Sequence, residues 1–349
     1  MKNDKKRKAE KRIDEDKVGF DAPNTPEQRQ FEKSYRVVRE RRLKRWDSLL
    51  KFYTMTPEDR TPKIKRFMRK GVPHKYRPYV WMTVTGALTR MNNSIGLYKN
   101  LLTKDKDVKV QEQIELDINR TFPDNKFFRD DTKQDKRKLY NILVAYSEYN
   151  KGVGYCQGMN FVAGLIILVV RDEERSFWLL VAMMDQILPE NYFSQSMSGL
   201  LADCDLLKEL IIDRFPDVKI HDPDQWNLFA VKWFVCLYID VLPIQTTLRI
   251  WDCLLFEGHK IIFRVALTLF GLNYDKLQEA DDLPSFIQPL RAWLHSRRLR
   301  FCMLEVKAMI YCLAQKNRKI LTLDYCTLNR TAAFSKSYFY IAPHGSFKK

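Results

Sequence analysis

Apolar residues recur along most of the chain at the spacing of about three to four residues that marks an amphipathic helix. The stretch 161–170 is apolar on every side, which predicts a helix buried within a helical core. Strand-like alternation is nowhere sustained, and no repeat of about 20–50 residues is visible. Helical periodicity also covers residues 34–52, 64–68, 80–87, 139–149, 176–187, 200–212, 226–239, 248–256 and 261–272. The sequence therefore predicts an all-α fold with helices packed in more than one layer.

The strength of this pattern divides the 349 residues into four parts. Residues 1–33 are charged and hold few large apolar groups, which predicts a flexible basic N-terminal arm. Residues 34–68 predict N-terminal amphipathic helices, and residues 69–272 contain the main helical domain. After Asn273 the periodicity weakens, so we expect residues 273–349 to form a divergent basic segment that is partly disordered.

The net charge of +17 is not spread evenly along the chain. Residues 1–81 carry +13 and residues 291–349 carry +10, whereas the apolar middle, residues 82–290, carries −6. A nucleic-acid-binding protein would add base-stacking or groove-reading modules to such a charge, and we find none. We therefore expect no nucleic acid partner, and any role of the basic ends to be a weak contact with an anionic membrane surface.

Cysteine usage and hydropathy indicate the compartment. The seven cysteines are odd in number, scattered and without a Cys-x-x-Cys pair, which is typical of reduced thiols rather than of a disulfide framework. The longest apolar run, 161–170, is shorter than the ~20 residues that span a bilayer. The first residues lack an apolar signal segment. We expect a soluble cytoplasmic protein.

Several familiar chemistries are excluded by missing motifs. The chain has no Gly-x-Ser-x-Gly elbow, no His-Glu-x-x-His, no Walker loop and no calcium loop. Its five histidines are isolated from one another in sequence. A hydrolase or metalloenzyme acting alone has little support, and we expect neither a metal nor a cofactor bound by this chain itself.

Two short constellations stand out. Residues 152–158 hold three glycines and Gln157 between predicted helices, in a sequence context that lacks the βαβ frame of a dinucleotide site. The glycines either permit a tight turn or let the backbone approach a partner closely. Asp117 and Arg120 lie three residues apart on one helix face, as a solvated ion pair or as an arginine held in place by a carboxylate.

A third constellation opens the main domain at residues 69–81. Pro73 suits the first turn of a helix. Arg77 and Trp81, four residues apart, can stack a guanidinium on an indole, although a plain helix start with a packed tryptophan explains the same residues.

Together, the order and spacing of these motifs resemble the TBC domain of Rab GTPase-activating proteins over about residues 34–272. The segments 119–125 and 258–269 are most similar to the growth hormone-regulated TBC branch of that family. The matching residues are Arg69-x-Gly-Val-Pro73, Arg77, Val80-Trp81, Ile114-x-x-Asp117-x-x-Arg120, Gly154-Tyr-Cys-Gln-Gly-Met159, Trp233-Phe234, Leu242-Pro243, Leu248-Arg-Ile-Trp-Asp252 and Glu257-Gly258.

The resemblance implies a two-lobed all-α domain that is not itself an enzyme but accelerates GTP hydrolysis by a Rab GTPase in trans. It implies that Arg120 is an arginine finger and Gln157 a glutamine finger. The residues implied to support them are Asp117, Tyr155, Gly154, Gly158, Arg77 and Trp81. GTP and Mg²⁺ would be bound by the partner GTPase, and the protein would regulate vesicle trafficking from the cytoplasm, at the periphery of endomembranes.

Two departures from the family pattern bear on these expectations. Lys151 stands where the family often has proline, and the chain after Asn273 does not resemble the usual final helices. A chain with an incomplete C-terminal lobe could bind a Rab GTPase without activating it. A non-catalytic Rab-binding scaffold is therefore the alternative hypothesis.

Overall fold

The computed structural model describes residues 18–20, 26–129, 134–217 and 223–280, together with 282, 285, 286 and 288. Within these ranges the regular elements are helices and no strand is present, which confirms the predicted all-α fold. Most of the predicted arm and of the segment 273–349 lies outside the described residues. No helix in the described part of the chain has both the length and the apolar content needed to cross a bilayer.

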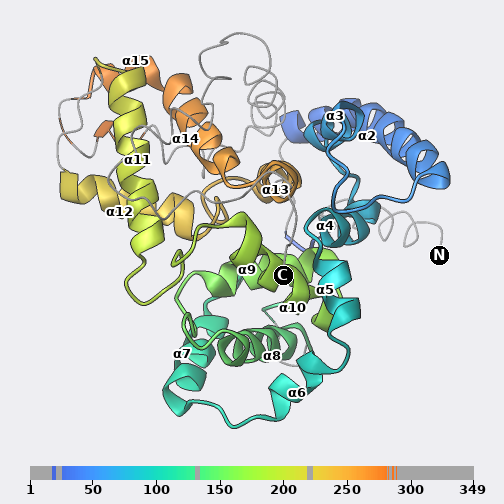
Figure 1. Ribbon diagram of the computed structural model, residues 1–349. Coiled ribbons are helices and arrows are strands. Elements are labelled where there is room, and N and C mark those ends of the chain that lie inside the picture. The colour runs from blue at the N-terminus through green and yellow to red at the C-terminus, as the bar shows by residue number, and fades with distance from the viewer. Residues whose placement is uncertain are drawn as a thin grey trace, which may run out of the picture.

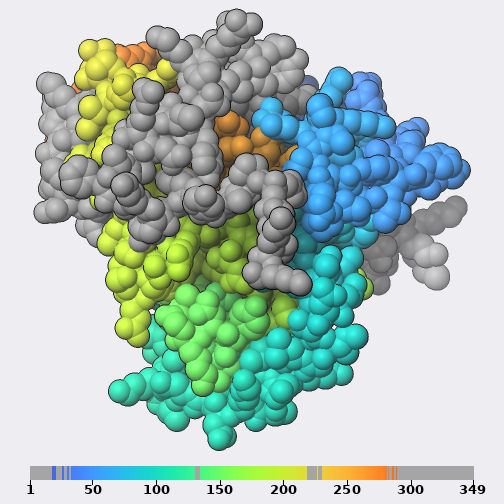
Figure 2. All heavy atoms as spheres, in the orientation of Figure 1, coloured from blue at the N-terminus to red at the C-terminus, as the bar shows by residue number. Residues whose placement is uncertain are grey.

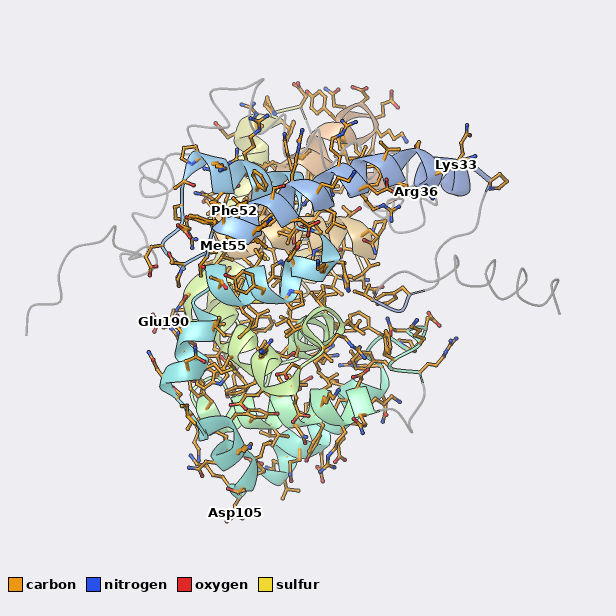
Figure 3. All side chains as sticks on the ribbon, turned by 90° about the vertical axis from the view of Figure 1, so that its right-hand side faces the viewer. Lys33, Arg36, Phe52, Met55, Asp105 and Glu190 are labelled. Carbon is orange, nitrogen blue, oxygen red and sulfur yellow. The ribbon has the colours of Figure 1, made fainter. Side chains whose placement is uncertain are left out.

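The N-terminal helices are α2 (Pro26–Phe52) and α3 (Pro62–Lys70). Thr61 caps α3 by accepting a hydrogen bond from the Ile64 amide at 3.3 Å, and Pro62 occupies the first turn, where its missing N–H is not needed. Figure 3 shows α2 crossing the upper part of the molecule, with Lys33 and Arg36 at one end and Phe52 at the other.

The start of α2 differs from the sequence prediction. The helix begins at Pro26, inside the segment predicted to be a flexible arm. Part of that segment is also packed: Val18 is fully buried, and Phe20 meets Phe122 edge to face at 5.3 Å between ring centroids. The apolar residues of the arm, few as they are, find partners in the loop after residue 119, which a local pattern could not indicate.

A first group of helices surrounds α9, in the lower part of Figure 1. As predicted, α9 is buried on nearly all sides, and it packs between α8 and α10. Further helices, α4 to α7, complete the group. The bounds are η2 His74–Tyr76, α4 Arg77–Val84, α5 Ala87–Asn93, α6 Leu97–Thr103, α7 Val108–Asn119, α8 Gln134–Tyr149, α9 Met159–Val170 and α10 Glu173–Ala182.

A second group lies in the upper part of Figure 1, where α11 packs on α12 and α14, and α13 packs on α14. The stretch predicted as one helix over 176–187 is split, because α10 passes at residue 183 into a π-helical turn, η3. The bounds are η3 Met183–Ile187, α11 Ser198–Arg214, α12 Pro223–Val235, α13 Ile244–Glu257, α14 Lys260–Leu272 and α15 Tyr274–Gln278.

Helix α13 joins the two groups, because it contacts α3 and α4 as well as α14. At this junction Asp252 accepts hydrogen bonds from Arg77 (3.0 and 3.1 Å), Trp81 (2.9 Å) and Arg249 (2.9 Å). The Val72 amide adds a fifth bond at 3.0 Å. We call these five residues the Asp252 cluster. It ties the start of the main domain to a helix that comes about half the chain later.

Of the two interpretations of Arg77 and Trp81, the structure shows the helix start with a packed tryptophan and not the stacked pair. Both side chains point their donors at the same carboxylate, and no cation–π contact joins them among the described residues. The indole of Trp81 instead lies against Trp251, with ring centroids 5.9 Å apart. A buried carboxylate with two oxygens attracts both donors more strongly than the face of an indole attracts one guanidinium.

Candidate functional site: the end of helix α7 and the glycine loop

Helix α7 ends at the arginine that the sequence singled out. Asp107 caps its first turn by accepting from the Lys109 amide at 2.8 Å. Ile114, Asp117 and Ile118 face the core, and Arg120 is the C-cap residue, with φ −98° and ψ 0°. The backbone leaves the helix at this residue, so the Arg120 side chain is half exposed while the residues before it are anchored.

Asp117 holds two groups that come from different segments. One carboxylate oxygen lies 2.5 Å from the Arg120 guanidinium, and the other accepts a hydrogen bond from the Tyr155 hydroxyl at 2.5 Å. The Asp117 side chain is only 1% exposed, whereas that of Arg120 is 50% exposed. A buried carboxylate therefore holds the guanidinium on one side and leaves the other side open to a partner.

Asn160 makes a second connection between α7 and the glycine loop, residues 152–158. Its amide donates to the Thr121 hydroxyl at 2.8 Å, and that hydroxyl donates to the Asp117 carbonyl at 2.7 Å. The side-chain oxygen of Asn160, Oδ1, accepts a hydrogen bond from the Gly158 backbone amide at 3.0 Å. Sequence reasoning missed Asn160, although a polar residue directly before the apolar run 161–170 was the available signal. In the structure Asn160 is fully buried, so its amide needs hydrogen-bond partners.

Glycine is required at the end of the loop for two reasons. Gly158, the N-cap residue of α9, has φ +106°, and a Cβ there would lie 2.7 Å from Cγ2 of Val235. Gly154 has φ +64° with open space around it. The loop is therefore tightly packed at Gly158, whereas at Gly154 there is room for a side chain and the amide donates to the Asn150 carbonyl at 2.8 Å. The side chain of Gln157, between these two glycines, is exposed.

The glycine loop is connected to the end of α7 by hydrogen bonds. In the space-filling view, residues coloured green border residues coloured teal in the lower part of the molecule (Figure 2). Tyr155 lies two residues before Gln157 and shares Asp117 with Arg120. One buried carboxylate thus links Arg120 to Tyr155, a residue of the loop that carries Gln157.

Burial keeps two side chains of the glycine loop, Tyr155 and Cys156, in their neutral protonated forms. Burial and the hydrogen bond to Asp117 raise the pKa of the Tyr155 hydroxyl well above its usual range, so Tyr155 stays a donor at neutral pH. Burial, followed by the negative charge of Asp117, also raises the pKa of the Cys156 thiol. Cys156 is therefore held as a neutral thiol, which makes it a poor nucleophile.

The site offers no nucleophile paired with a base, and the described residues contain no group of His, Cys, Asp or Glu that could hold a metal ion. Its accessible groups are a guanidinium and a carboxamide. Such groups stabilise negative charge and orient water in a reaction whose reacting atoms belong to another molecule.

Arg77 and Trp81, predicted to support the site, lie instead in the Asp252 cluster, and within the described residues no hydrogen bond connects them to Asp117 or Arg120.

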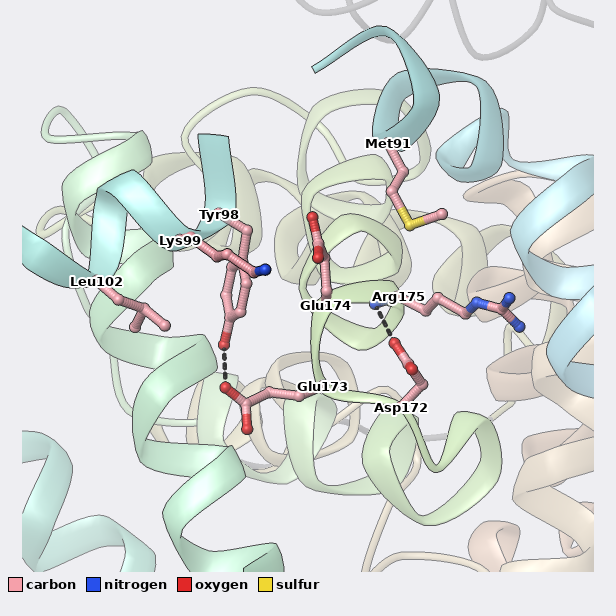
Figure 4. A pocket seen from close by; sticks show the side chains of 8 residues that line it. All are labelled: Met91, Tyr98, Lys99, Leu102, Asp172, Glu173, Glu174 and Arg175. Carbon is pink, nitrogen blue, oxygen red and sulfur yellow. Dashed lines mark hydrogen bonds between the residues drawn. The ribbon is translucent and has the colours of Figure 1, made fainter. Parts of the chain in front are cut away.

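A separate open hollow of about 440 Å³ lies between α6 and the start of α10 (Figure 4). There the Tyr98 hydroxyl donates to Glu173 at 2.7 Å. The hollow includes none of the predicted site residues.

Comparison with known proteins identifies the family of the chain. The model of the Rab-GTPase-TBC domain matches residues 74–278. Growth hormone-regulated TBC protein 1-A of Danio rerio is 48% identical over 259 residues, which are 73% of this chain and 72% of that protein. Growth hormone-regulated TBC protein 1 of Homo sapiens is 45% identical over 276 residues, 77% of this chain and 81% of that protein.

Solved structures give the same result. The crystal structure of the Chlamydomonas flagellar RabGAP TBC domain superimposes with a TM-score of 0.70 at 28% identity, covering 84% of this chain and 98% of that one. The Ypt/Rab-GAP domain of Gyp1p has the same fold, with a TM-score of 0.60 at 19% identity. The chain therefore belongs to the Rab-GTPase-TBC domain family.

Proposed function

We propose that this protein is a GTPase-activating protein for a Rab-family GTPase, to which it supplies Arg120 and Gln157 in trans. One observation carries the proposal: the buried carboxylate of Asp117 holds a half-exposed guanidinium together with the hydroxyl of Tyr155, two residues before an exposed glutamine. Family membership and the names of the two structural neighbours support the choice of a Rab as partner.

Arg120 suits the demand of phosphoryl transfer. In GTP hydrolysis the transition state spreads negative charge over the oxygens of the γ-phosphoryl group, so catalysis depends on positioning and electrostatic stabilisation. A guanidinium is permanently charged and presents a planar fork of donors to those oxygens. Asp117 orients that fork, and the exposed half of Arg120 is the part that would enter the nucleotide site of the GTPase.

Gln157 would orient the attacking water. A carboxamide both donates and accepts, so it can hold a water molecule in line with the phosphorus atom while contacting a backbone group of the partner. The glycine loop fixes the backbone on either side of Gln157 and leaves its side chain exposed. GTP and Mg²⁺ belong to the partner in this scheme, and the activator needs no cofactor of its own.

A panel of GTP-loaded Rab GTPases in single-turnover hydrolysis tests the activity. We expect at least one to be accelerated, and Arg120→Lys to remove most of that acceleration, on the order of 10³-fold, because lysine keeps the charge but loses the fork. Arg36→Lys, on the 78%-exposed arginine of α2, is the matched control and should leave the rate unchanged. A rate within twofold of the parent for Arg120→Lys would show that Arg120 is not the finger.

Gln157→Ala tests the second finger. We expect a comparable loss of acceleration with an unchanged helical circular dichroism spectrum, because the exposed side chain contributes little to packing. The control is Gln30→Ala, which removes an exposed glutamine from α2. Binding of a GTP-loaded Rab without any acceleration by the parent chain would instead identify a non-catalytic scaffold.

At the cellular level we propose a role in vesicle trafficking, with weak contact to anionic membranes through the basic N-terminal region, where residues 1–81 carry +13. Co-sedimentation with vesicles should rise with the fraction of anionic lipid and fall with salt. Binding that depends on neither would exclude the membrane contact while leaving the GTPase assay unaffected.

A further inference from the structure

Helix α7 carries a large apolar side chain in an unusual place. Leu116 is 68% exposed, while its neighbours Ile114, Asp117 and Ile118 are buried. A single exposed leucine is common on protein surfaces and does not by itself indicate a function. Leu116 is of interest because it precedes Arg120 by four residues on the same helix.

Residues four apart on an α-helix lie on the same face, with Cβ atoms about 5–6 Å apart. A specific protein–protein interface covers about 800 Å² on each partner, which corresponds to a patch with a radius of about 16 Å. If Arg120 reaches a phosphate bound by another protein, that protein must also cover the surface within one helical turn of Arg120. Leu116 therefore falls inside the contact, near its centre.

We infer that Leu116 is an apolar anchor for the GTPase: it contacts an apolar patch on the surface of the GTP-bound partner beside the nucleotide, and contributes to affinity rather than to the chemical step. This inference rests on the proposed function. Buried apolar anchors at the centre of an interface contribute more to affinity than residues at its rim. Leu116 would thus bring Arg120 into register with the phosphate without touching it.

The same helix provides an internal comparison. Val108 is 64% exposed, nearly as much as Leu116, but it lies twelve residues before Arg120, about 18 Å along the helix axis. That distance places Val108 at or beyond the edge of a patch centred on Arg120. Ile95, 90% exposed, is on the turn between α5 and α6, two helices that lie to the right of α7 in Figure 1. The same substitution at each of the three positions should therefore affect GTPase binding most at Leu116, less at Val108 and least at Ile95.

The experiment uses the full chain and the Rab GTPase that responds best in the panel. For each of Leu116→Asp, Val108→Asp and Ile95→Asp, KM and kcat of the stimulated reaction are measured, together with binding to the same GTPase loaded with GDP and aluminium fluoride. We expect Leu116→Asp to raise KM and weaken binding by at least about tenfold with kcat nearly unchanged. Val108→Asp should change KM by no more than about threefold, and Ile95→Asp not at all.

Leu116→Ala, which keeps the helix and adds no charge, should raise KM by about three- to tenfold. The inference is overturned if both Leu116 variants keep KM within twofold of the parent, or if they lower kcat at constant KM, which would make Leu116 a support for Arg120. Failure of the proposed function has a different signature: the parent chain accelerates no Rab, or Arg120→Lys retains full kcat, and the anchor role then falls with it.

Discussion

Two buried carboxylates of this protein each hold arginine, with opposite results. Asp252 is fully buried, and the side chains of Arg77 and Arg249 that bond to it are each 6% exposed. Asp117 is just as buried at 1%, yet its arginine, Arg120, is 50% exposed. The same kind of ion pair therefore has two different roles. At Asp252 it joins helices, and at Asp117 it presents a charged group to solvent.

The difference comes from where each pair lies in its helix. Asp252 is in the middle of α13 and faces α3 and α4, so donors from several segments converge on it and water is excluded. Burial lowers the pKa of the Arg249 guanidinium, and the charge of Asp252 opposes that change. Arg120 is the C-cap of α7, where the chain leaves the helix, and half of its side-chain surface stays exposed.

Removal of the charge at position 252 should have the largest effect on the fold. We expect Asp252→Asn to lower the free energy of unfolding by about 3–5 kcal/mol, because two buried guanidinium groups lose their counter-charge. Urea unfolding followed by circular dichroism measures the loss. Asp105→Asn, at an exposed aspartate, is the control and should stay within about 0.5 kcal/mol. Equal effects at the two positions would mean that the Asp252 cluster does not hold the helices together.

Matched glycine substitutions extend the comparison to the backbone beside each carboxylate. Gly71 has φ +104°, and a Cβ there would lie 1.9 Å from Nη1 of Arg249. Gly71→Ala should therefore displace Arg249 and cost about 2–4 kcal/mol. Gly154→Ala, at φ +64° with no atom within 4 Å of the added Cβ, should cost about 1 kcal/mol. A reversed order in thermal or urea unfolding would contradict the packing described at Gly71.

Local features of both regions could be predicted from the sequence. The unbroken apolar run of residues 161–170 indicated a buried helix, and the i,i+3 spacing of Asp117 and Arg120 indicated one helical face. These predictions depend only on residues within a turn or two of each other. The resemblance to a known family then supplied the roles of Arg120 and Gln157, which no local physical rule could assign.

Contacts between distant segments could not be predicted. The sequence indicated either a stacked pair or a plain helix start for Arg77 and Trp81, but not their common partner, Asp252, which follows more than 170 residues later. Likewise, nothing in the sequence of α7 shows that Tyr155 donates a hydrogen bond to Asp117. Nothing in the glycine loop shows that Val235 of α12 leaves no room for a side chain at position 158. Such contacts form only when the helices pack in three dimensions, so the local sequence around each residue does not predict them.

At position 117 the effect on activity should exceed the effect on the fold. We expect Asp117→Asn to reduce the stimulated kcat by about tenfold or more, because Arg120 loses the charge that orients it. The free energy of unfolding should fall by only about 2 kcal/mol, since water can solvate the exposed guanidinium. A stability loss as large as that of Asp252→Asn, with normal kcat per folded molecule, would remove the distinction between the two carboxylates.

The smallest expected effect is at Tyr155, whose hydroxyl donates to Asp117 at 2.5 Å. Tyr155→Phe keeps the ring and removes this one bond, so unfolding should become easier by only about 1 kcal/mol. Because the second oxygen of Asp117 still holds Arg120, we expect kcat to fall by a few-fold, less than for Asp117→Asn. In the double variant the loss should equal that of Asp117→Asn alone, since both changes act through one carboxylate. Additive losses in single-turnover assays would show that Tyr155 acts on the glycine loop independently of Asp117.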